Sequence, residues 1–524
     1  MNVNLKQKYY LFIPILLAFL LVVYVTLSNN WPFSWDIYTH INYALAYVNN
    51  GITNVDPFLN APKGKQIGYP PLFHIILILF ACVFKLGFIN AAKLFQILFS
   101  VINMALVVYV GYKLKDELTG IAAGLLLLSS FMFTRMILPI PETVALIFFT
   151  LSVYLCYQAC TLKVDKYAIF AGICALLMLV THFSTFVYFM ILITVLMLGY
   201  MIVSKNMNVL RYYLLVIIPV IILGVLAMIA LAIISPSHFS HIFSGIYTIA
   251  TNPMSLFMGQ VAMGLERYIK CIGILPLVFS VIGLILSVKN KEFLFVTIWG
   301  ILAFLFSNLH WFGIPVYTFR MLVYLIIPMV ILGGYAVSVF SEKLQPTKKN
   351  FGVLLIIALI ILSVIFAFTS INDDSFKISS ATTEESSYQI APPTSDEEEL
   401  INWFNTQDNN KSVLINNLYL GTVISSVNEI PLHYSFDVYT NKTLSKSSQS
   451  SLEKENIGYI VYDKKLVVNN TKEYDDLHVE YLEGSYYPSY YFTKKINKKN
   501  FDTIELPNTK KVFENDRFIV SEVI

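Results

Sequence analysis

The feature that most constrains this chain is the recurrence of apolar runs long enough to cross a lipid bilayer. A spanning helix needs roughly 20 predominantly apolar residues, and only helices or closed barrels satisfy the backbone there. Of the 524 residues, 56% are hydrophobic and 13% charged, about half the charge of an ordinary soluble domain. We therefore predict an all-α polytopic membrane protein with about eleven transmembrane helices. These are predicted near 9–27, 92–112, 119–133, 141–160, 167–181, 185–203, 211–234, 269–288, 291–307, 319–340 and 350–370.

Lysine placement predicts how these helices are oriented, because cytoplasmic loops carry the excess of Lys and Arg. The apolar run 71–88 decides the topology. If it crossed the membrane, every later loop would invert and the lysine rule would fail. We therefore expect 71–88 to lie at the outer surface or to re-enter, in a plasma-membrane protein with a cytoplasmic N-terminus and an extracytoplasmic C-terminus. The loops that carry the rule contain Lys113 and Lys115, Lys163 and Lys166, Lys205 and Arg211, Lys289 and Lys291, and Lys343, Lys348 and Lys349.

The composition changes near residue 371 and divides the chain. Residues 1–370 are predicted to form the transmembrane domain, with a first outer loop at 28–91 that contains interfacial helices. The stretch 371–394 is rich in Ser, Thr, Pro and acids and is typical of a linker. Residues 395–524 are predicted to form a small soluble α/β domain outside the membrane. Its signals are a capping box from Ser395 to Glu398, short strands at 412–415 and 459–462, and a hairpin over 512–523 with its turn at 514–516.

Polar residues are sparse in the transmembrane part, and the predicted topology gathers many of them on the outer side. A polar cavity at the outer leaflet would explain this, since ionisable groups at membrane depth are costly and usually functional. The alternative is that interfacial polar groups simply face water. The histidines concerned are His40, His74, His182, His238, His241 and His310, the acids are Asp36, Asp56, Glu142 and Glu266, and the arginines are Arg135, Arg267 and Arg320.

The first outer loop is the segment richest in candidate site residues. Asp36 and His40 are four residues apart, so they share one face of a predicted helix. Asp36 also stands near the start of that helix, where it could serve only as a cap. Further along, Lys63 and Lys65 lie among glycines and could hold a phosphate, or they could belong to a solvated loop. The small net charge of +3, without a basic run, argues against a nucleic-acid partner.

These residues resemble the GT-C superfamily of membrane glycosyltransferases. The resemblance consists of an acid after the first helix, an interfacial helix, and then a G-Y-P-P-L-F-H stretch at 68–74. An L-P-I-P-E-T loop at 138–143, a T-H turn at 181–182 and an arginine that opens a late helix at 320 continue it. It covers about residues 1–370. The family includes protein mannosyltransferases, aminoarabinose transferases and the catalytic subunits of oligosaccharyltransferases.

Two departures narrow what the resemblance implies. The first loop lacks a tight D-x-D or E-x-D pair, and the tail lacks the W-W-D-Y-G sequence of oligosaccharyltransferases; residues 34–38 are only a superficial echo of it. Transfer of a whole oligosaccharide to asparagine is therefore disfavoured. The resemblance implies instead the transfer of one sugar from a polyprenyl phosphate carrier to a hydroxyl of a glycan, lipid or protein acceptor, with inversion.

The resemblance also implies roles for individual residues. Asp36 would be the general base, and Arg320 would be the principal contact of the lipid phosphate. No cofactor is required, although a divalent cation is compatible with such a site, and no metal ligands are assigned. The substrate-binding residues are expected to be His40, Lys63, Lys65, His74, Arg135, Glu142, His182, Arg267 and Arg320.

Two other function classes stay open from the sequence. One is a polytopic transporter or lipid flippase, which would more often show paired halves with broken helices near the midplane. The other is a non-catalytic membrane subunit or receptor whose tail is the binding module. The enzyme interpretation makes a geometric demand that separates them: Asp36, His182 and Arg320 must converge on one cavity.

Overall fold

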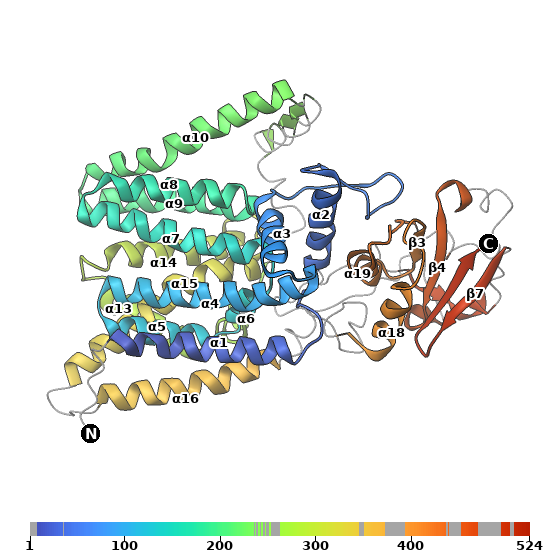
Figure 1. Cartoon of the computed structure of the whole chain (residues 1–524). Helices are drawn as coiled ribbons and strands as arrows, with labels where there is room; N and C mark the ends of the chain where they lie inside the picture. The colour runs from blue at the N-terminus through green and yellow to red at the C-terminus, as the bar shows by residue number, and fades with distance from the viewer. Residues whose placement is uncertain are drawn as a thin grey trace.

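The computed structural model describes residues 8–34, 36–234, 262–344, 351–372, 393–435, 452–469, 494–502 and 508–524, together with isolated residues between these ranges. Most helices of the first 371 residues run alongside one another in a bundle, and a smaller domain with a β-sheet lies beyond one end of it (Figure 1).

Each predicted transmembrane range overlaps a helix of this bundle. Among the described residues, seven helices are long and apolar enough to cross a membrane. The number rises to eight if α13 and the short helices before it, which meet at a bend of 109°, form one span; α5 and α14 are shorter apolar helices. The chain is thus a multi-pass membrane protein. The bundle helices are α1 (Phe12–Leu27), α4 (Phe88–Leu114), α5 (Glu117–Leu128), α7 (Pro141–Leu162), α8 (Asp165–Leu179), α9 (Phe183–Ser204), α10 (Asn208–Ile234), α13 (Ile274–Ser287), α14 (Leu294–Ser307), α15 (Thr318–Leu344) and α16 (Phe351–Ile371).

Short helical turns link several of these helices. One of them, α6, precedes α7, and the pair η3 and α12 precedes α13. They occupy stretches where the apolar pattern is interrupted by Arg135 or by Glu266 and Arg267. Their bounds are η1 (Lys8–Leu11), α6 (Met132–Ile137), η3 (Leu265–Arg267), α12 (Tyr268–Ile272) and η4 (Leu309–Phe312).

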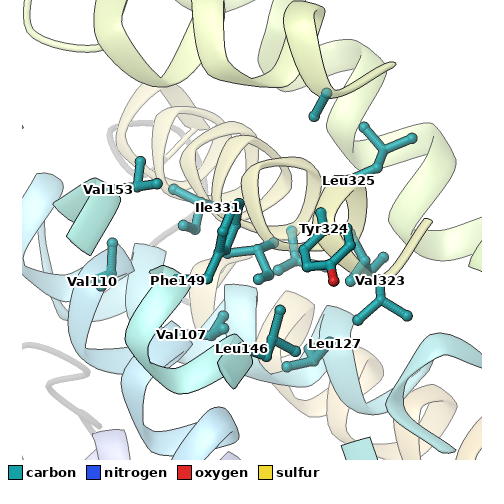
Figure 2. Close-up of a cluster of buried hydrophobic side chains, with 14 of the residues drawn as sticks. Val107, Val110, Leu127, Leu146, Phe149, Val153, Val323, Tyr324, Leu325 and Ile331 are labelled. Atoms are coloured by element: carbon teal, nitrogen blue, oxygen red, sulfur yellow. The ribbon is translucent and has the colours of Figure 1, made fainter. Parts of the chain in front are cut away.

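Helix α15 lies at the centre of the bundle, with 89% of its apolar window buried. Figure 2 shows side chains of α15 packed among those of α4, α5 and α7. Tyr324 is the polar exception, since it carries a hydroxyl into this apolar layer. The labelled side chains are Val107 and Val110 of α4, Leu127 of α5, Leu146, Phe149 and Val153 of α7, and Val323, Tyr324, Leu325 and Ile331 of α15.

Two glycines allow the close packing of α15 against its neighbours. A Cβ atom on Gly283 of α13 would lie 1.9 Å from the carbonyl oxygen of Leu332. A Cβ atom on Gly334 of α15 would lie 2.4 Å from the carbonyl oxygen of Thr119 in α5. Small residues at such crossings let helix backbones approach in a membrane, where no hydrophobic force drives them together.

Two helices lie across one end of the bundle rather than along it. They are α2 (Asp36–Asn50) and α3 (Leu72–Phe84), and Figure 1 shows both running transverse to the bundle helices. The backbone N–H of Leu72 donates to the carbonyl of Val180 at the end of α8, which fixes the start of α3 at this end. The transverse course of α3 agrees with the prediction that the run 71–88 does not cross.

The C-terminal part forms a four-stranded sheet in the order β3-β4-β8-β7. β3 pairs parallel to β4, whereas β4 with β8 and β8 with β7 are antiparallel. Both predicted strands and the predicted hairpin lie in this sheet. The larger elements are α18 (Ser395–Phe404), β3 (Ser412–Ile415), α19 (Leu418–Asn428), β4 (Ile457–Asp463), β7 (Thr509–Glu514) and β8 (Phe518–Val523); the smaller ones are η6 (Lys464–Leu466), β5 (Val467–Val468), β6 (Ile496–Asn497) and α22 (Lys498–Phe501).

The predicted capping box was wrong by one residue. Thr394, not Ser395, is the N-cap of α18, and Glu397, not Glu398, completes the box. Thr394 Oγ1 accepts from the Glu397 N–H at 3.4 Å, and Glu397 Oε2 accepts from the Thr394 N–H at 2.8 Å. The sequence Thr-Ser-Asp-Glu-Glu matches the capping pattern in two registers. The register with Glu397 prevails because this side chain also turns inward to meet a buried arginine.

That arginine is Arg517, and it forms a buried ion cluster inside the C-terminal domain. Its Nε and Nη2 atoms donate to the two oxygens of Asp463 at 3.0 and 2.7 Å. Its Nη1 atom donates to Glu397 Oε1 at 2.6 Å. The Arg517 side chain is 2% exposed and the two carboxylates are 1% exposed. Every side-chain nitrogen of Arg517 is therefore matched to a carboxylate oxygen.

The C-terminal domain is packed directly onto the first loop. One hydrophobic cluster contains Ile41 of α2, Leu59 and Phe73 as well as Leu420 and Val461 of the C-terminal domain. Helix α19 contacts α2. The two parts therefore share one hydrophobic core.

Backbone hydrogen bonds at Leu432 add to this contact. The Leu432 N–H donates to the carbonyl of Phe58 at 2.6 Å, and its carbonyl accepts from the Ala61 N–H at 3.0 Å. Leu432 also forms a β-bridge with Val413 of the sheet. One residue thus joins the backbone of the first loop to the sheet of the C-terminal domain.

Candidate active site

A cleft of about 320 Å³ opens between the transverse end of the bundle and the C-terminal domain. One side is formed by Asp36, Thr39, His40 and Tyr43 of α2. Their spacing of three, four and seven residues from Asp36 places them on one face of the helix. The predicted pairing of Asp36 and His40 on a helix face is therefore directed into a cavity.

Asp36 is the first residue of α2 and is partly exposed. Among the described residues, no donor hydrogen-bonds to its carboxylate, so its oxygens are available to a ligand. Burial raises the pKa of Asp36, and the positive charges of Arg320 and Arg135 oppose that rise. An aspartate that served only as a helix cap would instead accept a backbone N–H.

A connected set of side chains lies beside Asp36 on the bundle side. Arg135 of α6 pairs with Glu142 of α7, with Nη2 and Oε2 2.7 Å apart. Tyr324 donates to the other Glu142 oxygen at 3.5 Å, and its Oη lies 2.7 Å from Thr185 Oγ1. The Thr185 hydroxyl in turn lies 2.7 Å from His182 Nδ1. The set thereby links α6, α7, α15 and the start of α9.

Local sequence explains how two of these residues are placed. Pro141 starts α7 because its missing N–H costs nothing at the first helical position. Glu142 follows it, where the helix dipole favours a carboxylate. His182 is the N-cap of α9, and its ring accepts from the Thr185 N–H. Burial lowers the pKa of His182, with Glu142 opposing and Arg320 adding to the effect.

Arg320 is the third residue of α15 and is exposed at the same end. Its guanidinium lies 5.1 Å from the centre of the Tyr317 ring. The positive charge of Arg320 acts to lower the pKa values of both Asp36 and His182. Arg320 is therefore close enough to Asp36 and His182 for its charge to act on both, but of these three residues only Asp36 lines the cleft, so their convergence on one cavity stays a prediction.

His40 and His74 form a buried pair, with Nδ1 of the first 3.0 Å from Nε2 of the second. Burial lowers the pKa of His40 well below its ordinary value and that of His74 to about 3. Both rings are therefore neutral near pH 7, and the pair is a hydrogen bond rather than a repulsive contact. The Tyr69 ring lies edge-on to His40 and stacked near His182, so it connects the cleft to the bundle side.

Lys65 lines the cleft, and a small hairpin places it there. β1 (Val55–Asp56) pairs with β2 (Lys65–Gln66). The turn requires Gly64, which has φ of +78° and no room for a Cβ, since Val55 Cγ1 would lie 2.5 Å away. Burial lowers the pKa of Lys65, and the charges of Asp56 and Asp36 raise it.

The remaining predicted residues lie elsewhere. Lys63 is exposed in the loop before Gly64 and does not line the cleft. Arg267 lies at the end of η3 and is not among the principal charges that act on Asp36 or His182. His310 lies in η4. His238 and His241 lie outside the described residues.

The other wall of the cleft was not predicted from the sequence. It is formed by α19 and the segment that follows, through Leu418, Tyr419, Thr422 and Tyr434. No local signal marks these residues, because the packing of α19 on α2 joins positions more than 380 residues apart. Tyr324 and Thr185 were also missed; a hydroxyl within an apolar helix was the available signal for Tyr324.

A metal site would need several ligand side chains close together. Within the described ranges, no three His, Cys, Asp or Glu side chains gather as ligands. Glu142 already pairs with Arg135.

Comparison with known proteins identifies the fold. No family model and no curated sequence matches the chain. Solved structures do. ArnT from Cupriavidus metallidurans bound to undecaprenyl phosphate has a TM-score of 0.62 at 11% identity, over 97% of both chains. The Archaeoglobus fulgidus oligosaccharyltransferase tethered with an acceptor peptide has a TM-score of 0.60 at 13% identity, over 88% of this chain and 70% of its own.

A third neighbour extends the comparison. The mycobacterial arabinofuranosyltransferase AftD has a TM-score of 0.54 at 11% identity, over 99% of this chain and 40% of its own. All three neighbours are GT-C glycosyltransferases. At these identities the likeness is one of fold, so the chain has the GT-C fold, as the sequence resemblance implied.

Proposed function

We propose that this protein transfers a sugar from a polyprenyl phosphate carrier to an acceptor hydroxyl on the outer face of the membrane, with inversion at the anomeric carbon. The observation that carries the proposal is the position of Asp36. It lines the cleft on one side and lies within electrostatic reach of Arg320 and Arg135 on the other. A group at this junction can meet both an incoming hydroxyl and a departing phosphate.

The chemistry needs one base. The acceptor oxygen forms a bond to the anomeric carbon as the bond from that carbon to the phosphate oxygen breaks, and the hydroxyl proton passes to the Asp36 carboxylate. Phosphate leaves as an anion, so a second carboxylic acid of the kind found in glycosidases is not needed. Burial strengthens the base, because it raises the pKa of Asp36.

The arginines can stabilise the negative charge that develops on the departing phosphate. Cationic donors fixed near a developing anion stabilise the transition state. Arg320 is exposed at the site, and a guanidinium can contact two phosphate oxygens at once. Arg135 is held by Glu142, so it contributes positive field with part of its charge already balanced. The neighbour solved with undecaprenyl phosphate supports a carrier of this chemistry.

The transporter alternative fits these observations less well. A transport site near the midplane would place charged groups within the helix bundle. Here Asp36, Arg135 and Arg320 gather at one end of it, beside a cleft that the C-terminal domain closes. The neighbours solved with this fold are transferases.

The test is Asp36→Asn. Loss of a general base lowers rates by about 10²–10⁴-fold, whereas asparagine caps a helix nearly as well as aspartate. A deletion strain would be complemented with wild type or variant, and surface glycans and lipid-linked sugars measured by mass spectrometry. We expect the deletion strain to lose one glycan species and accumulate its donor, and Asp36→Asn to fail to restore it at normal protein levels.

Asp165→Asn is the matched control. Asp165 is likewise the first residue of a helix, α8, but it pairs with Arg211 at a surface away from the cleft. It should restore the glycan fully. An active Asp36→Asn protein would refute the role of Asp36 and direct attention to Glu142. A deletion strain with unchanged glycans and lipid-linked sugars would contradict the proposed function itself.

A further inference from the structure

We infer that the wall contributed by the C-terminal domain is the acceptor subsite and that the acceptor it takes is a carbohydrate. The inference rests on the proposed function for the identity of the reaction, but it draws on different residues. They are Tyr419 and Thr422 in the first turns of α19 and Tyr434 beyond it. None of them is part of the arginine-lined side.

The two sides of Asp36 differ in chemistry, which separates donor from acceptor. The bundle side presents Arg135 and Arg320, which suit a phosphate. Among the described residues that line the cleft, Lys65 is the only cation, and apart from Asp36 the others are uncharged. Both sides meet at Asp36. If the donor phosphate is bound on the bundle side, the cleft is available to the acceptor, whose hydroxyl attacks the sugar.

The lining of the cleft is what a pyranose ring requires. Four of the twelve lining residues are tyrosines: Tyr43, Tyr69, Tyr419 and Tyr434. One face of a sugar ring is made of C–H groups, which pack on aromatic rings, while its rim of hydroxyls needs hydrogen-bond partners. Such partners are present in Thr39, Gln66 and Thr422. Ligand sites of this type combine apolar and aromatic walls with a few placed polar groups.

Local contacts hold these groups in position. Tyr434 hydrogen-bonds to Thr422, and burial raises the pKa of Tyr434 to about 12. The Thr422 hydroxyl donates to the carbonyl of Leu418 at 2.8 Å. The wall itself is fixed to the first loop by the backbone bonds of Leu432. A preformed wall lowers the ordering cost of binding.

A peptide acceptor fits the cleft less well. An extended peptide is usually bound by adding a strand to a sheet edge. In the part of the chain that the structure describes, the strand that lines the cleft is β2, which has two residues. Main-chain recognition would therefore be limited to one or two hydrogen bonds, whereas the tyrosine-rich lining offers a surface for rings.

The experiment uses the full-length protein in lipid nanodiscs. Saturation-transfer NMR would be measured with methyl α-D-mannopyranoside, methyl β-D-glucopyranoside and methyl α-D-galactopyranoside, and with N-acetyl-serine amide and N-acetyl-threonine amide as peptide probes. We expect saturation transfer to at least one glycoside and to neither amide. Thr422→Val removes one hydroxyl and should weaken glycoside binding about threefold to tenfold.

Gly68→Leu gives a steric test within the same cleft. Gly68 lines it, and a Cβ there would meet no atom within 4 Å, so a leucine side chain is accommodated without disturbing the backbone and adds bulk at the cleft. It should abolish glycoside binding. The matched control is Tyr462→Phe in β4, because the Tyr462 hydroxyl is buried without a hydrogen-bond partner among the described residues and lies outside the cleft. It should bind like wild type.

The outcomes distinguish this inference from the proposed function. Undecaprenyl phosphate binding, measured on the same nanodiscs, should survive Thr422→Val and Gly68→Leu. Absence of saturation transfer to every glycoside, binding of the amides instead, or glycoside binding unaffected by Gly68→Leu would overturn the carbohydrate subsite while leaving the transferase proposal intact. Conversely, if the protein binds glycosides but its deletion changes no glycan, the carbohydrate subsite would stand and the proposed transferase function would be contradicted.

Discussion

The molecule contains two clusters in which an arginine contacts carboxylates, and they differ in how completely their hydrogen-bonding groups are paired. In the C-terminal domain, Arg517 donates from all three of its nitrogens to Asp463 and Glu397, and none of the three side chains is more than 2% exposed. At the bundle end, Arg135 makes one ion pair with Glu142, and the two side chains are 17% and 11% exposed.

The second cluster differs from the first because some of its polar groups have no hydrogen-bond partner among the described residues. Arg135 Nε is buried without a hydrogen-bond partner among the described residues. The Asp36 carboxylate, which is partly exposed, accepts no hydrogen bond from the described residues either. Buried polar groups normally find partners, because leaving one unpaired costs free energy. We interpret the matched cluster as structural and the unmatched one as prepared for ligands.

The largest effect on stability should come from breaking the matched cluster. Arg517→Met leaves Asp463 and Glu397 buried without their cation, which typically costs about 3–5 kcal/mol. We expect the C-terminal domain to unfold at a markedly lower temperature, measured by differential scanning fluorimetry of the full-length protein.

A surface lysine provides the control for Arg517. Lys511 pairs with Glu514 on an exposed part of β7, where ion pairs contribute little. Lys511→Met should therefore melt like wild type. Equal melting of Arg517→Met and wild type would remove the distinction between the two clusters.

A smaller effect, of a different kind, is expected at Arg320. Arg320→Ala should leave melting unchanged but weaken undecaprenyl phosphate binding, since hydrogen bonds to charged groups contribute about 1.5–3 kcal/mol. Arg320→Lys keeps the charge but loses the two-pronged contact, so its binding should lie between those of Ala and wild type. Lipid binding would be measured on nanodiscs by native mass spectrometry. Unchanged affinity in Arg320→Ala would show that this arginine does not meet the phosphate.

Asp56 is an intermediate case and gives the smallest expected effect. It is fully buried; one oxygen accepts from the Phe58 N–H at 2.8 Å, and the other has no partner among the described residues. Burial raises its pKa to about 6. The folded state therefore holds a proton that the unfolded state releases near pH 4, and stability is lost as pH rises from about 4 to 6.

Asp56→Asn removes this loss while keeping the oxygen that Phe58 contacts. We expect it to melt above wild type at pH 8, by the equivalent of about 1–2 kcal/mol, and with a smaller difference at pH 5. Thermal scans at the two pH values test this. A variant that is less stable than wild type at pH 8 would contradict this and show that the charged carboxylate is stabilised in the folded state by the backbone N–H groups of Phe58 and Leu59 and by the charge of Lys65.

The bundle was largely predictable from sequence because the bilayer requires long apolar runs. The position of α3 followed from lysine placement, which reports sidedness without any knowledge of packing. The same rule predicted that one end of the bundle contains Asp36, Glu142, His182 and Arg320. It could not tell Arg135 from Arg267, because an arginine at an interface turns toward a site or away from it according to helix packing.

The wall of the cleft was beyond prediction for another reason. Tyr419 and Tyr434 lie in ordinary positions of a small α/β domain, and their relation to Asp36 depends on how that domain packs onto α2. The capping box shows the same limit on a smaller scale. Two registers satisfy the local pattern, and the distant Arg517 selects one of them.

The backbone bonds at Leu432 have a consequence for how the protein is made. The first loop leaves the ribosome early, but the segment that covers its apolar side chains follows roughly 370 residues later, as the contact between Phe58 and Ser425 illustrates. At about 5–20 residues per second, synthesis of the intervening chain takes some tens of seconds. Throughout that interval the loop has no partner for its hydrophobic face, so a nascent chain stalled before α19 would be a target for proteolysis and chaperones.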